Sequence, residues 1–324
     1  MRQVSILGFP GALASAITGM IDLFRLAGVT WARIQGTEPE RYFEVQLLTE
    51  DGAPCRCLNG ISLLADGSFA AHEPGDLILV PTIGGPIVPT LDESGALLEW
   101  LKRQAAEGRE IASNCTGAFL LAEAGLLDSR KATTHWGYSA LFQQRYPQVD
   151  FHPEQLVTLD GPIACAGGGT AWWDLGILLV ERYTGAQVAR ELAKAFVIDA
   201  GRRSQAPYAA LQTKRYHQDD AILALQDWLD QRYARPLGTD DLVRQSGLSS
   251  RSLLRRFKAA TGETPQHYLQ ALRIEAAKSQ LESSRLPVEQ ITQAVGYEDV
   301  SSFSRLFRRQ TGLTPSDYRA RFGR

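Results

Sequence analysis

Short apolar runs alternate with amphipathic stretches over the first 200 residues of the chain. Mostly apolar runs between turn residues predict buried strands, at residues 4–9, 43–48, 76–81, 110–113 and 163–166. Apolar residues at helical spacing predict helices, at residues 14–27, 95–107, 117–124 and 171–184. Strands that alternate with helices are typical of a parallel sheet with helices on both faces. The pattern therefore predicts a flavodoxin-like α/β sandwich for this region.

The pattern changes after residue 200. Residues 201–214 are polar, include a proline and have no clear period, whereas residues 219–233 are amphipathic. The remainder has helical periodicity interrupted by glycine and proline turns. We predict two domains, residues 1–200 and 219–324, joined by a linker at residues 201–218, and we expect the second domain to be all helical.

The C-terminal region contains a repeat. Residues 247–265 read GLSSRSLLRRFKAATGETP, and residues 296–315 read GYEDVSSFSRLFRRQTGLTP. From Leu253 to Pro265 the two copies align at a constant offset of 50 residues, and both end in Thr-Gly-x-Thr-Pro. Each copy follows a short predicted helix, at residues 240–245 or 288–295, and each has a turn and then a second helix. The repeat therefore predicts two helix-turn-helix motifs.

Each second helix is predicted to have an apolar face and a cationic face. We expect Leu253, Leu254 and Phe257 to face the core in the first copy, and Phe303, Leu306 and Phe307 in the second. Ser249 or Ser250 could cap the first of these helices, and Asp299 or Ser301 the second. In a helix-turn-helix the second helix enters the major groove of DNA by its N-terminal end. The residues predicted to contact DNA are Arg251, Ser252, Arg255, Arg256, Lys258, Ser301, Ser302, Arg305, Arg308 and Arg309, with Arg319 as a further phosphate contact.

The distribution of charge agrees with this interpretation but is modest. The chain has a net charge of −2. Residues 211–324 carry 18 Lys and Arg against 13 Asp and Glu, a net charge of +5, whereas residues 1–210 carry 16 against 23, a net charge of −7. A basic end on an acidic body is typical of a nucleic-acid-binding domain joined to a domain of another kind.

Residues 219–322 resemble the DNA-binding domain of AraC/XylS-type transcriptional regulators. The matching stretches are GLSSRSLLRRFKAATGETPQHYLQALRIEAAKSQLE and LPVEQITQAVGYEDVSSFSRLFRRQTGLTPSDYR. The resemblance implies that a long helix, here at about residues 265–282, joins the two motifs, which read adjacent major grooves on one face of promoter DNA. We expect double-stranded promoter DNA, RNA polymerase and a second copy of the chain as partners.

Residues 1–200 resemble the ThiJ/PfpI branch of class I glutamine-amidotransferase-like folds. The resemblance rests on EIASNCTGAFLLAEAGLLDSRKATTHW, residues 110–136, in which a strand runs into Cys115 and a helix follows. This is the topology of a nucleophile elbow. The helix N-terminus is expected to lower the pKa of the thiol, and the position at a strand-to-helix turn is expected to leave the thiol partly exposed. GlxA-type regulators join such a domain to an AraC-type domain, so the combined resemblance covers nearly the whole chain.

Several residues are candidates for a ligand site in the first domain, and their roles stay open at this point. Cys115 could be a nucleophile, a ligand contact or an inert buried thiol, and His135 could be its partner, a ligand contact or a core histidine. Peptidase-like members of the superfamily have a histidine directly after the cysteine, whereas this chain has Thr116, which argues against a hydrolase. Glycines 167–169 could also line the site. The candidate ligand residues are Cys115, Thr116, His135, Trp136, Asp22, Gly84 and Gly85.

Other features limit the possible functions. The N-terminal residues lack the features of a signal peptide, and no apolar run of about 18 residues predicts a membrane span. The four cysteines are expected to be reduced in the cytoplasm, and Cys55-Arg56-Cys57 lacks zinc-ligand spacing. We expect no catalytic residue, metal, cofactor or membrane contact. The sequence thus predicts a DNA-binding transcription regulator that senses a small metabolite or dimerises through its first domain. The alternative is a cysteine-dependent hydrolase or amidase fused to a DNA-binding domain.

Overall fold

The computed structural model describes residues 1–211, 215 and 217–323 of the chain. The chain divides into two compact units, Met1–Gln205 and Ala206–Arg324, and each is described here by itself. Residues 212–214 and 216, which belong to the expected linker, lie outside the described residues, as does residue 324.

The first unit is built on a mixed sheet that is mostly parallel. Within the described residues the sheet has seven strands in the order β10-β11-β7-β6-β1-β2-β5, and the pairing of β10 with β11 is antiparallel. The strands are β1 (Arg2–Leu7), β2 (Phe43–Thr49), β5 (Gly67–Ser68), β6 (Leu77–Val80), β7 (Glu110–Asn114), β10 (Val157–Asp160) and β11 (Ile163–Ala166). Every residue of β6 and β11 is buried, as expected for strands covered on both faces.

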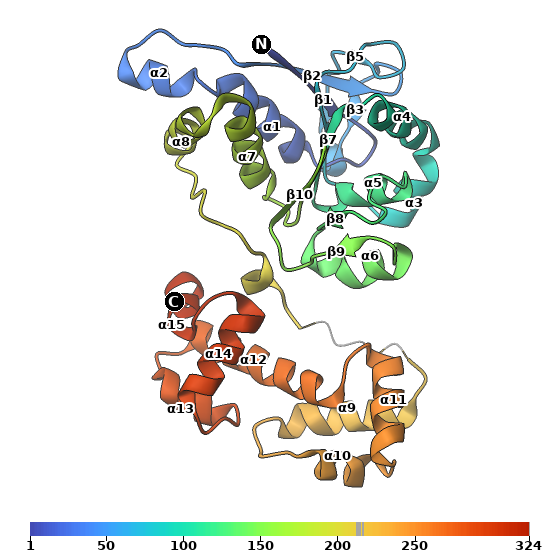
Figure 1. Ribbon diagram of the computed structural model, residues 1–324, viewed down its shortest axis with the longest axis vertical. Helices are drawn as coiled ribbons and strands as arrows, with labels where there is room; N and C mark the ends of the chain where they lie inside the picture. Colours follow the sequence, from blue (N-terminus) through green and yellow to red (C-terminus); the bar gives the residue numbers. More distant parts are fainter. Residues whose placement is uncertain (212–214, 216, 324) are drawn as a thin grey trace. The chain divides into compact units, whose positions relative to one another are not determined.

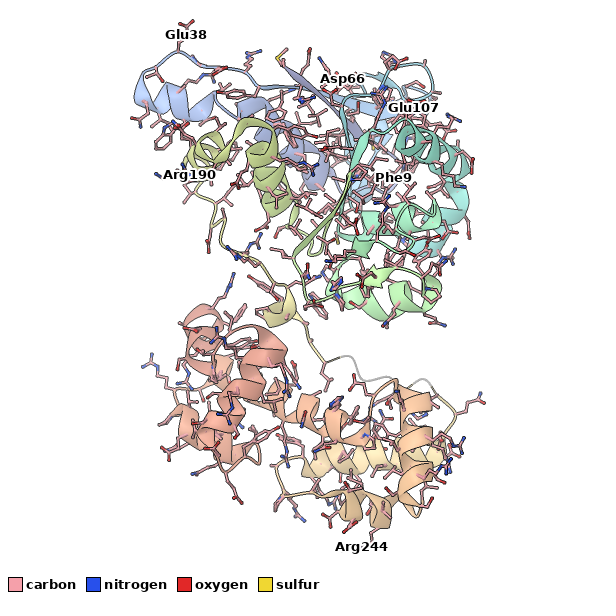
Figure 2. The ribbon with its side chains drawn as sticks, viewed as in Figure 1. Phe9, Glu38, Asp66, Glu107, Arg190 and Arg244 are labelled. Carbon is pink, nitrogen blue, oxygen red and sulfur yellow. The ribbon has the colours of Figure 1, made fainter. Side chains whose placement is uncertain are left out.

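Helices cover both faces of this sheet (Figure 1). One layer contains α1 (Ala14–Leu26), α2 (Thr30–Gln35), α7 (Trp172–Thr184) and α8 (Ala186–Ala195). The other contains α3 (Ile87–Glu93), α4 (Gly95–Ala106), α5 (Ala118–Glu123) and α6 (Ser139–Arg145). Two short ladders lie outside the main sheet, β3 (Cys55–Arg56) with β4 (Ser62–Leu63), and β8 (Lys131–Ala132) with β9 (Asp150–Phe151). Side chains fill the space between the layers (Figure 2). The predicted α/β sandwich is confirmed.

The second unit is helical throughout its described residues. Its helices are α9 (Asp220–Arg232), α10 (Thr239–Ser246), α11 (Ser250–Thr261), α12 (Pro265–Ser283), α13 (Val288–Ala294), α14 (Val300–Thr311) and α15 (Pro315–Phe322). One core is centred on Phe257 and a second on Phe307. The long helix α12 contributes Tyr268 and Leu269 to the first core and Ile274 and Leu281 to the second, so it joins the two motifs. The predicted pair of helix-turn-helix motifs is confirmed.

The repeated Thr-Gly-x-Thr-Pro sequence has the same structure in both copies. In the first copy the Thr261 hydroxyl donates to the Phe257 carbonyl at 2.8 Å, and Gly262 ends α11 with a φ of 85°. Thr264 then caps α12 by accepting a bond from the His267 amide. In the second copy the corresponding residues are Thr311, Gly312 with a φ of 77°, and Thr314, which caps α15. The sequence repeat therefore encodes a helix end, a turn and the start of the next helix.

One predicted core residue is exposed. Leu254 has 49% of its surface accessible, whereas Leu253 and Phe257 are buried at 2% and 0%. Leu253 and Phe257 are one helical turn apart and share a face, and Leu254 lies about 100° further round the helix axis. The expectation that Leu254 faces the core is therefore wrong.

The described residues include no helix that is both long and apolar enough to cross a membrane.

Candidate functional site

Both second helices of the helix-turn-helix motifs start with a side-chain cap. The turn before α11 contains Gly247 in the left-handed region with a φ of 66°, and Ser249 accepts a bond from the Ser252 amide at 3.3 Å. In the second motif Gly296 has a φ of 87°, and Asp299 accepts a bond from the Ser302 amide at 2.7 Å. Ser249 and Asp299 are therefore the caps among the alternatives that the sequence left open, and they fix where each helix begins.

The N-terminal halves of α11 and α14 present polar and cationic side chains on an exposed face. Ser252 is partly buried, and within the described residues the cations of this face make no ion pair. In the second motif an Arg305 nitrogen donates to the Ser302 hydroxyl at 3.0 Å, which orients both side chains. The exposed predicted DNA contacts are Arg251, Arg255, Lys258, Ser301, Ser302, Arg305, Arg308 and Arg309. Exposed cations at a capped helix start suit an interaction with phosphate and base edges.

Two arginines that the sequence assigned to phosphate contacts have partners within the second unit. The Arg256 guanidinium forms two hydrogen bonds to the Asp219 carboxylate, at 2.6 and 2.8 Å. Asp219 is also the cap of α9, so the pair ties α11 to the start of α9. Arg319 donates to the Leu286 carbonyl. Both guanidinium groups therefore bond within the second unit, and the interface proposed below leaves out Arg256 and Arg319.

The candidate ligand residues of the first unit centre on the segment Asn114–Gly117, which we call the elbow. β7 ends at Asn114, Cys115 has a φ of 55°, and a turn of 3-10 helix leads into α5. A left-handed conformation is strained for a residue other than glycine and is often found at functional sites. The elbow follows the carboxyl end of a parallel strand, near the place where the strand order reverses between β6 and β1. Ligands commonly bind at this position in open α/β sheets.

Neighbouring segments cover the elbow and bury the Cys115 thiol. Only 4% of Cys115 is accessible, because residues 82–83 and 134 pack over it: the Thr116 hydroxyl donates to the Ile83 carbonyl at 2.8 Å, and the Thr134 hydroxyl donates to the Cys115 carbonyl at 2.8 Å. Burial raises the pKa of the thiol, and hydrogen bonds with Thr116 and Thr82 offset this only in part. The expectation of a partly exposed thiol with a lowered pKa is therefore wrong, because desolvation outweighs the N-terminus of a six-residue helix.

His135 is partly buried beside Trp136, and its ring nitrogens have distinct roles. Nδ1 accepts a hydrogen bond from the Gly137 amide at 3.0 Å, so in the neutral ring the proton is on Nε2. Burial also lowers the pKa of His135, which favours this neutral form. Among the described residues no hydrogen bond joins His135 to Cys115. The imidazole is therefore arranged to donate through Nε2 and not to remove a proton through Nδ1.

The structure brings most, but not all, of the candidate ligand residues together. The bonds from Thr116 to Ile83 and from Thr134 to Cys115 bring two segments next to the elbow, one containing Gly84 and Gly85 and the other His135 and Trp136. By contrast, Asp22 is exposed on α1, and no hydrogen bond or ion pair among the described residues links it to the elbow.

Sequence reasoning missed a polar residue of the elbow. The amide of Asn114 is buried, and its nitrogen donates to the Thr82 hydroxyl at 2.6 Å. Its oxygen Oδ1 has no hydrogen-bond partner among the described residues. A buried acceptor without a partner is costly and is often completed by a ligand or water. Its place directly before Cys115 in the sequence was the only signal that could have indicated it.

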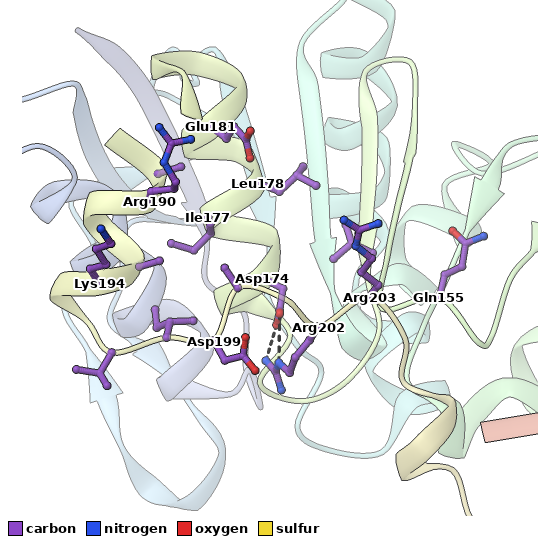
Figure 3. Close-up of a pocket in the computed structure, with 16 residues that line it drawn as sticks. Gln155, Asp174, Ile177, Leu178, Glu181, Arg190, Lys194, Asp199, Arg202 and Arg203 are labelled. Atoms are coloured by element: carbon purple, nitrogen blue, oxygen red, sulfur yellow. Dashed lines mark hydrogen bonds and ion pairs between the residues drawn. The ribbon is translucent and has the colours of Figure 1, made fainter. Parts of the chain in front are cut away.

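Separate cavities lie elsewhere in the first unit. One of about 990 Å³ lies between α7, α8 and residues 197–203, where Arg202 is paired with Asp174 (Figure 3). Others of about 400 and 370 Å³ adjoin α2 and β3. None of these three is lined by the candidate ligand residues. Cys55 and Cys57 are buried with their sulfurs 3.7 Å apart, and the described residues contain no cluster of three or more potential metal ligands.

Comparison with known proteins identifies relatives of both units. Residues 27–182 match the DJ-1/PfpI family, and residues 242–321 match a helix-turn-helix domain family. The HTH-type transcriptional regulator CdhR of Pseudomonas aeruginosa is 32% identical over 275 residues, which cover 85% of this chain and 81% of CdhR. The HTH-type transcriptional regulator GlxA of Rhizobium meliloti is 30% identical over 224 residues, 69% of each chain.

An enzyme and a solved structure are also similar. Isonitrile hydratase of Pseudomonas putida is 33% identical over 220 residues, 66% of this chain and 88% of the enzyme. The crystal structure of a putative transcriptional regulator protein from Vibrio parahaemolyticus aligns with a TM-score of 0.51 and 24% identity over 60% of this chain and 98% of that one, which supports the fold. From its two matched domains and its similarity to CdhR and GlxA, the chain belongs to the AraC-type helix-turn-helix transcriptional regulators that have an N-terminal DJ-1/PfpI domain.

Proposed function

We propose that the second unit binds promoter DNA by placing the N-terminal halves of α11 and α14 in the major groove. The observation that carries this proposal is the duplicated geometry of the two helices, each capped at its start and each presenting exposed cations. None of these cations makes a salt bridge within the described residues. Arg251 and Arg255 in the first motif, and Ser302 and Arg305 in the second, are the proposed base contacts. Lys258, Arg308 and Arg309 lie further along the helices and are the proposed phosphate contacts.

The elbow is the proposed effector site of the first unit. Within the described residues Asn114 Oδ1 is an acceptor without a partner, and His135 Nε2 is a donor because Nδ1 accepts the bond from Gly137. A small polar molecule with its own donor and acceptor groups would satisfy both. Binding such a molecule needs no thiolate, which agrees with the raised pKa of Cys115.

The first unit is proposed to act without catalysis. A cysteine nucleophile needs a thiolate or an adjacent base. Burial disfavours the thiolate of Cys115, Thr116 is bonded to Ile83, and the Nδ1 atom of His135 is occupied by Gly137. The similarity to isonitrile hydratase supports the alternative of a cysteine-dependent enzyme fused to a DNA-binding domain. Turnover of isonitrile, amide or ester substrates by the purified protein that disappears in Cys115→Ser would establish that alternative.

We further propose that the protein acts in the cytoplasm as a homodimer that contacts RNA polymerase at its promoters. Membership of a family of transcriptional regulators supports these roles. Light scattering on the DNA complex would measure the number of chains bound to one promoter fragment.

The DNA-binding proposal is tested with the full-length protein. Duplexes are selected from a random 30-base-pair library, and their affinity is measured by fluorescence anisotropy. We expect enrichment of a defined sequence that wild type binds much more tightly than the unselected pool. A protein that is folded by circular dichroism but enriches no sequence at low salt would contradict the proposal. Thermal shift against a metabolite library, compared between wild type and Asn114→Ala, tests the effector site.

A further inference from the structure

Gln205 is buried in the first unit, although it lies within the stretch that the sequence predicts as a linker. Only 1% of its surface is accessible. Its side-chain nitrogen donates to the Thr134 carbonyl at 2.8 Å, the Thr133 hydroxyl at 3.1 Å and the Gln155 carbonyl at 3.2 Å. Its side-chain oxygen accepts a bond from the Trp136 amide at 3.1 Å. The amide group thus has partners on both of its atoms, and three of its four contacts are with residues 133–136.

The backbone around Gln205 is also arranged for this side chain. The Gln205 amide donates to the Glu154 carbonyl at 3.0 Å. Gly167, the residue after β11, lies directly against the side chain, and a Cβ atom at that position would be 2.3 Å from the Gln205 nitrogen. Any larger residue at position 167 would displace Gln205. The Gln205 side chain therefore occupies space that is open only because residue 167 is a glycine.

The loop held by Gln205 is the one that covers the elbow. The Thr134 hydroxyl donates to the Cys115 carbonyl, while the Thr134 carbonyl accepts from Gln205. A single residue thus connects Gln205 to the strained backbone of Cys115. His135, whose Nε2 is the proposed donor to an effector, lies between Thr134 and Trp136. Gln205 bonds to both of these neighbours.

The chain after Gln205 is soon anchored again, this time within the second unit. The Tyr208 hydroxyl accepts a bond from Arg321 at 2.7 Å, and its ring packs edge-on against Phe322. The Ala209 carbonyl accepts a bond from Lys278, a residue of α12 that is 6% accessible. Only residues 206 and 207 separate the anchor in the first unit from the first of these contacts.

We propose that Gln205 is a positioning residue that holds residues 133–136 over the elbow and couples the state of this loop to DNA binding by the second unit. The inference rests on the proposed function, because it assigns a regulatory link to the proposed effector site. Coupling between two sites is reciprocal, so DNA binding must alter the loop if the loop alters DNA binding. The link can therefore be tested with DNA as the only ligand.

The experiment is hydrogen–deuterium exchange by mass spectrometry on the full-length protein, with and without a duplex that this protein has selected from the random library. The amide of Trp136, which donates to Gln205, is the informative position. In wild type we expect DNA to change the exchange rate of the peptide containing residues 133–136 by about threefold or more. In Gln205→Met, which keeps the length of the side chain without its hydrogen bonds, this change should disappear while DNA affinity stays within about twofold.

Two further variants separate coupling from simple stability. Ser204→Ala removes the neighbouring hydroxyl bond to Glu154 and keeps the Gln205 side chain, so the response to DNA should remain. Thr134→Val keeps the bond from Gln205 but removes the bond to Cys115, so residues 133–136 should still respond and the elbow peptide should not. If Gln205→Met fails to fold, Gly167→Ala provides the test, because its Cβ atom would lie 2.3 Å from the Gln205 nitrogen and displace that side chain, so the same response should disappear. A loop that exchanges equally with and without DNA in wild type, or a full response in Gln205→Met, overturns the inference. Failure to select any duplex would instead overturn the proposed DNA-binding function.

Discussion

Arg256 in α11 grips the carboxylate of Asp219 at the start of α9 through two hydrogen bonds. The two residues are 37 positions apart, and the pair joins α11 of the first motif to α9, which shares its core. Its neighbour Arg255 is exposed and has no acidic partner among the described residues. Adjacent arginines on one helix therefore differ, because Arg256 is bonded within the fold and Arg255 is exposed.

This difference predicts opposite effects for two alanine variants. Arg256→Ala should lower the melting temperature of the second unit and change DNA affinity little at temperatures where the unit stays folded. Arg255→Ala should leave the melting temperature unchanged and weaken DNA binding. Calorimetry and fluorescence anisotropy on both variants measure the two effects. If Arg256→Ala binds DNA weakly while melting like wild type, Arg256 is a DNA contact after all.

The same pair predicts a dependence of stability on acid. Arg256 lowers the pKa of Asp219, so the folded state holds its proton less tightly than the unfolded state. The stabilisation is therefore present above the unfolded pKa of about 3.9 and is lost as pH falls through the lower folded pKa. The difference in melting temperature between wild type and Arg256→Ala should shrink as pH falls below about 4. A difference that stays constant down to pH 2 would contradict the assignment.

Arg255 and Arg305 are predicted to read base edges. An arginine that grips a guanine through O6 and N7 contributes about 1–3 kcal/mol to discrimination against other bases. Arg255→Ala and Arg305→Ala should each relax the preference at one position of the selected sequence. The two positions should lie about one helical turn apart, roughly 34–36 Å along the DNA. Repeating the selection with each variant reveals the position. If both variants select the same sequence as wild type, Arg255 and Arg305 do not read bases and are only surface residues.

Leu254 is predicted to contribute an apolar contact to the same interface. It is exposed between Arg251 and Lys258 on α11, and the repeat places Ser304 at the corresponding position of α14. Apolar side chains in the major groove contact the methyl group of thymine. Leu254→Ser should therefore leave stability nearly unchanged and weaken the preference for one thymine in the selected site. Substitution of uracil for that thymine should match the effect in wild type and have no further effect in the variant.

The proposed phosphate contacts are predicted to determine the salt dependence of binding. Each phosphate that a cation neutralises contributes about −0.9 to the slope of log affinity against log salt. Lys258→Ala and Arg308→Ala should each reduce the magnitude of this slope by about one unit. Arg190→Ala on α8 of the first unit, labelled in Figure 2, is the control and should leave the slope unchanged. Equal slopes for all three variants and wild type would remove Lys258 and Arg308 from the interface.

The Cys115 thiol is predicted to react slowly with alkylating reagents. Burial raises its pKa, so alkylation of the Cys115 peptide by iodoacetamide near neutral pH should be slower than alkylation of free cysteine. The stabilisation from the neutral thiol is present below the unfolded pKa of about 8.5 and is lost as pH rises through the higher folded pKa. Cys115→Ser should therefore lose less stability than wild type in alkaline solution. We also expect this variant to fold and bind DNA normally and to change the response to an effector. Rapid alkylation at pH 7 would indicate an activated nucleophile.

The sequence by itself determined the order of the elements, the two repeated motifs and the topology of the elbow. These features depend on patterns within short stretches: apolar periodicity, a glycine at a turn, and a threonine or aspartate that caps the next helix. Thr261 and Thr311 illustrate this, since each hydrogen-bonds to a carbonyl four residues earlier. Turns and helix ends of this kind depend on residues within one or two turns of the chain, and the repeat shows the same pattern in both copies.

The tertiary structure alone decided the environment of the individual side chains. Periodicity could not tell that Leu254 faces outward, because two adjacent leucines satisfy the same pattern. The burial of Cys115 requires residues 82–83 and 134, and the pairing of Arg256 requires Asp219, all distant along the chain. Gln205 belongs to a polar stretch that reads as linker, yet its partners lie about 50 to 72 residues away. Desolvation and hydrogen bonding depend on which distant segments pack together. This packing determines the exposure and pKa of each side chain and whether it is free to bind a ligand.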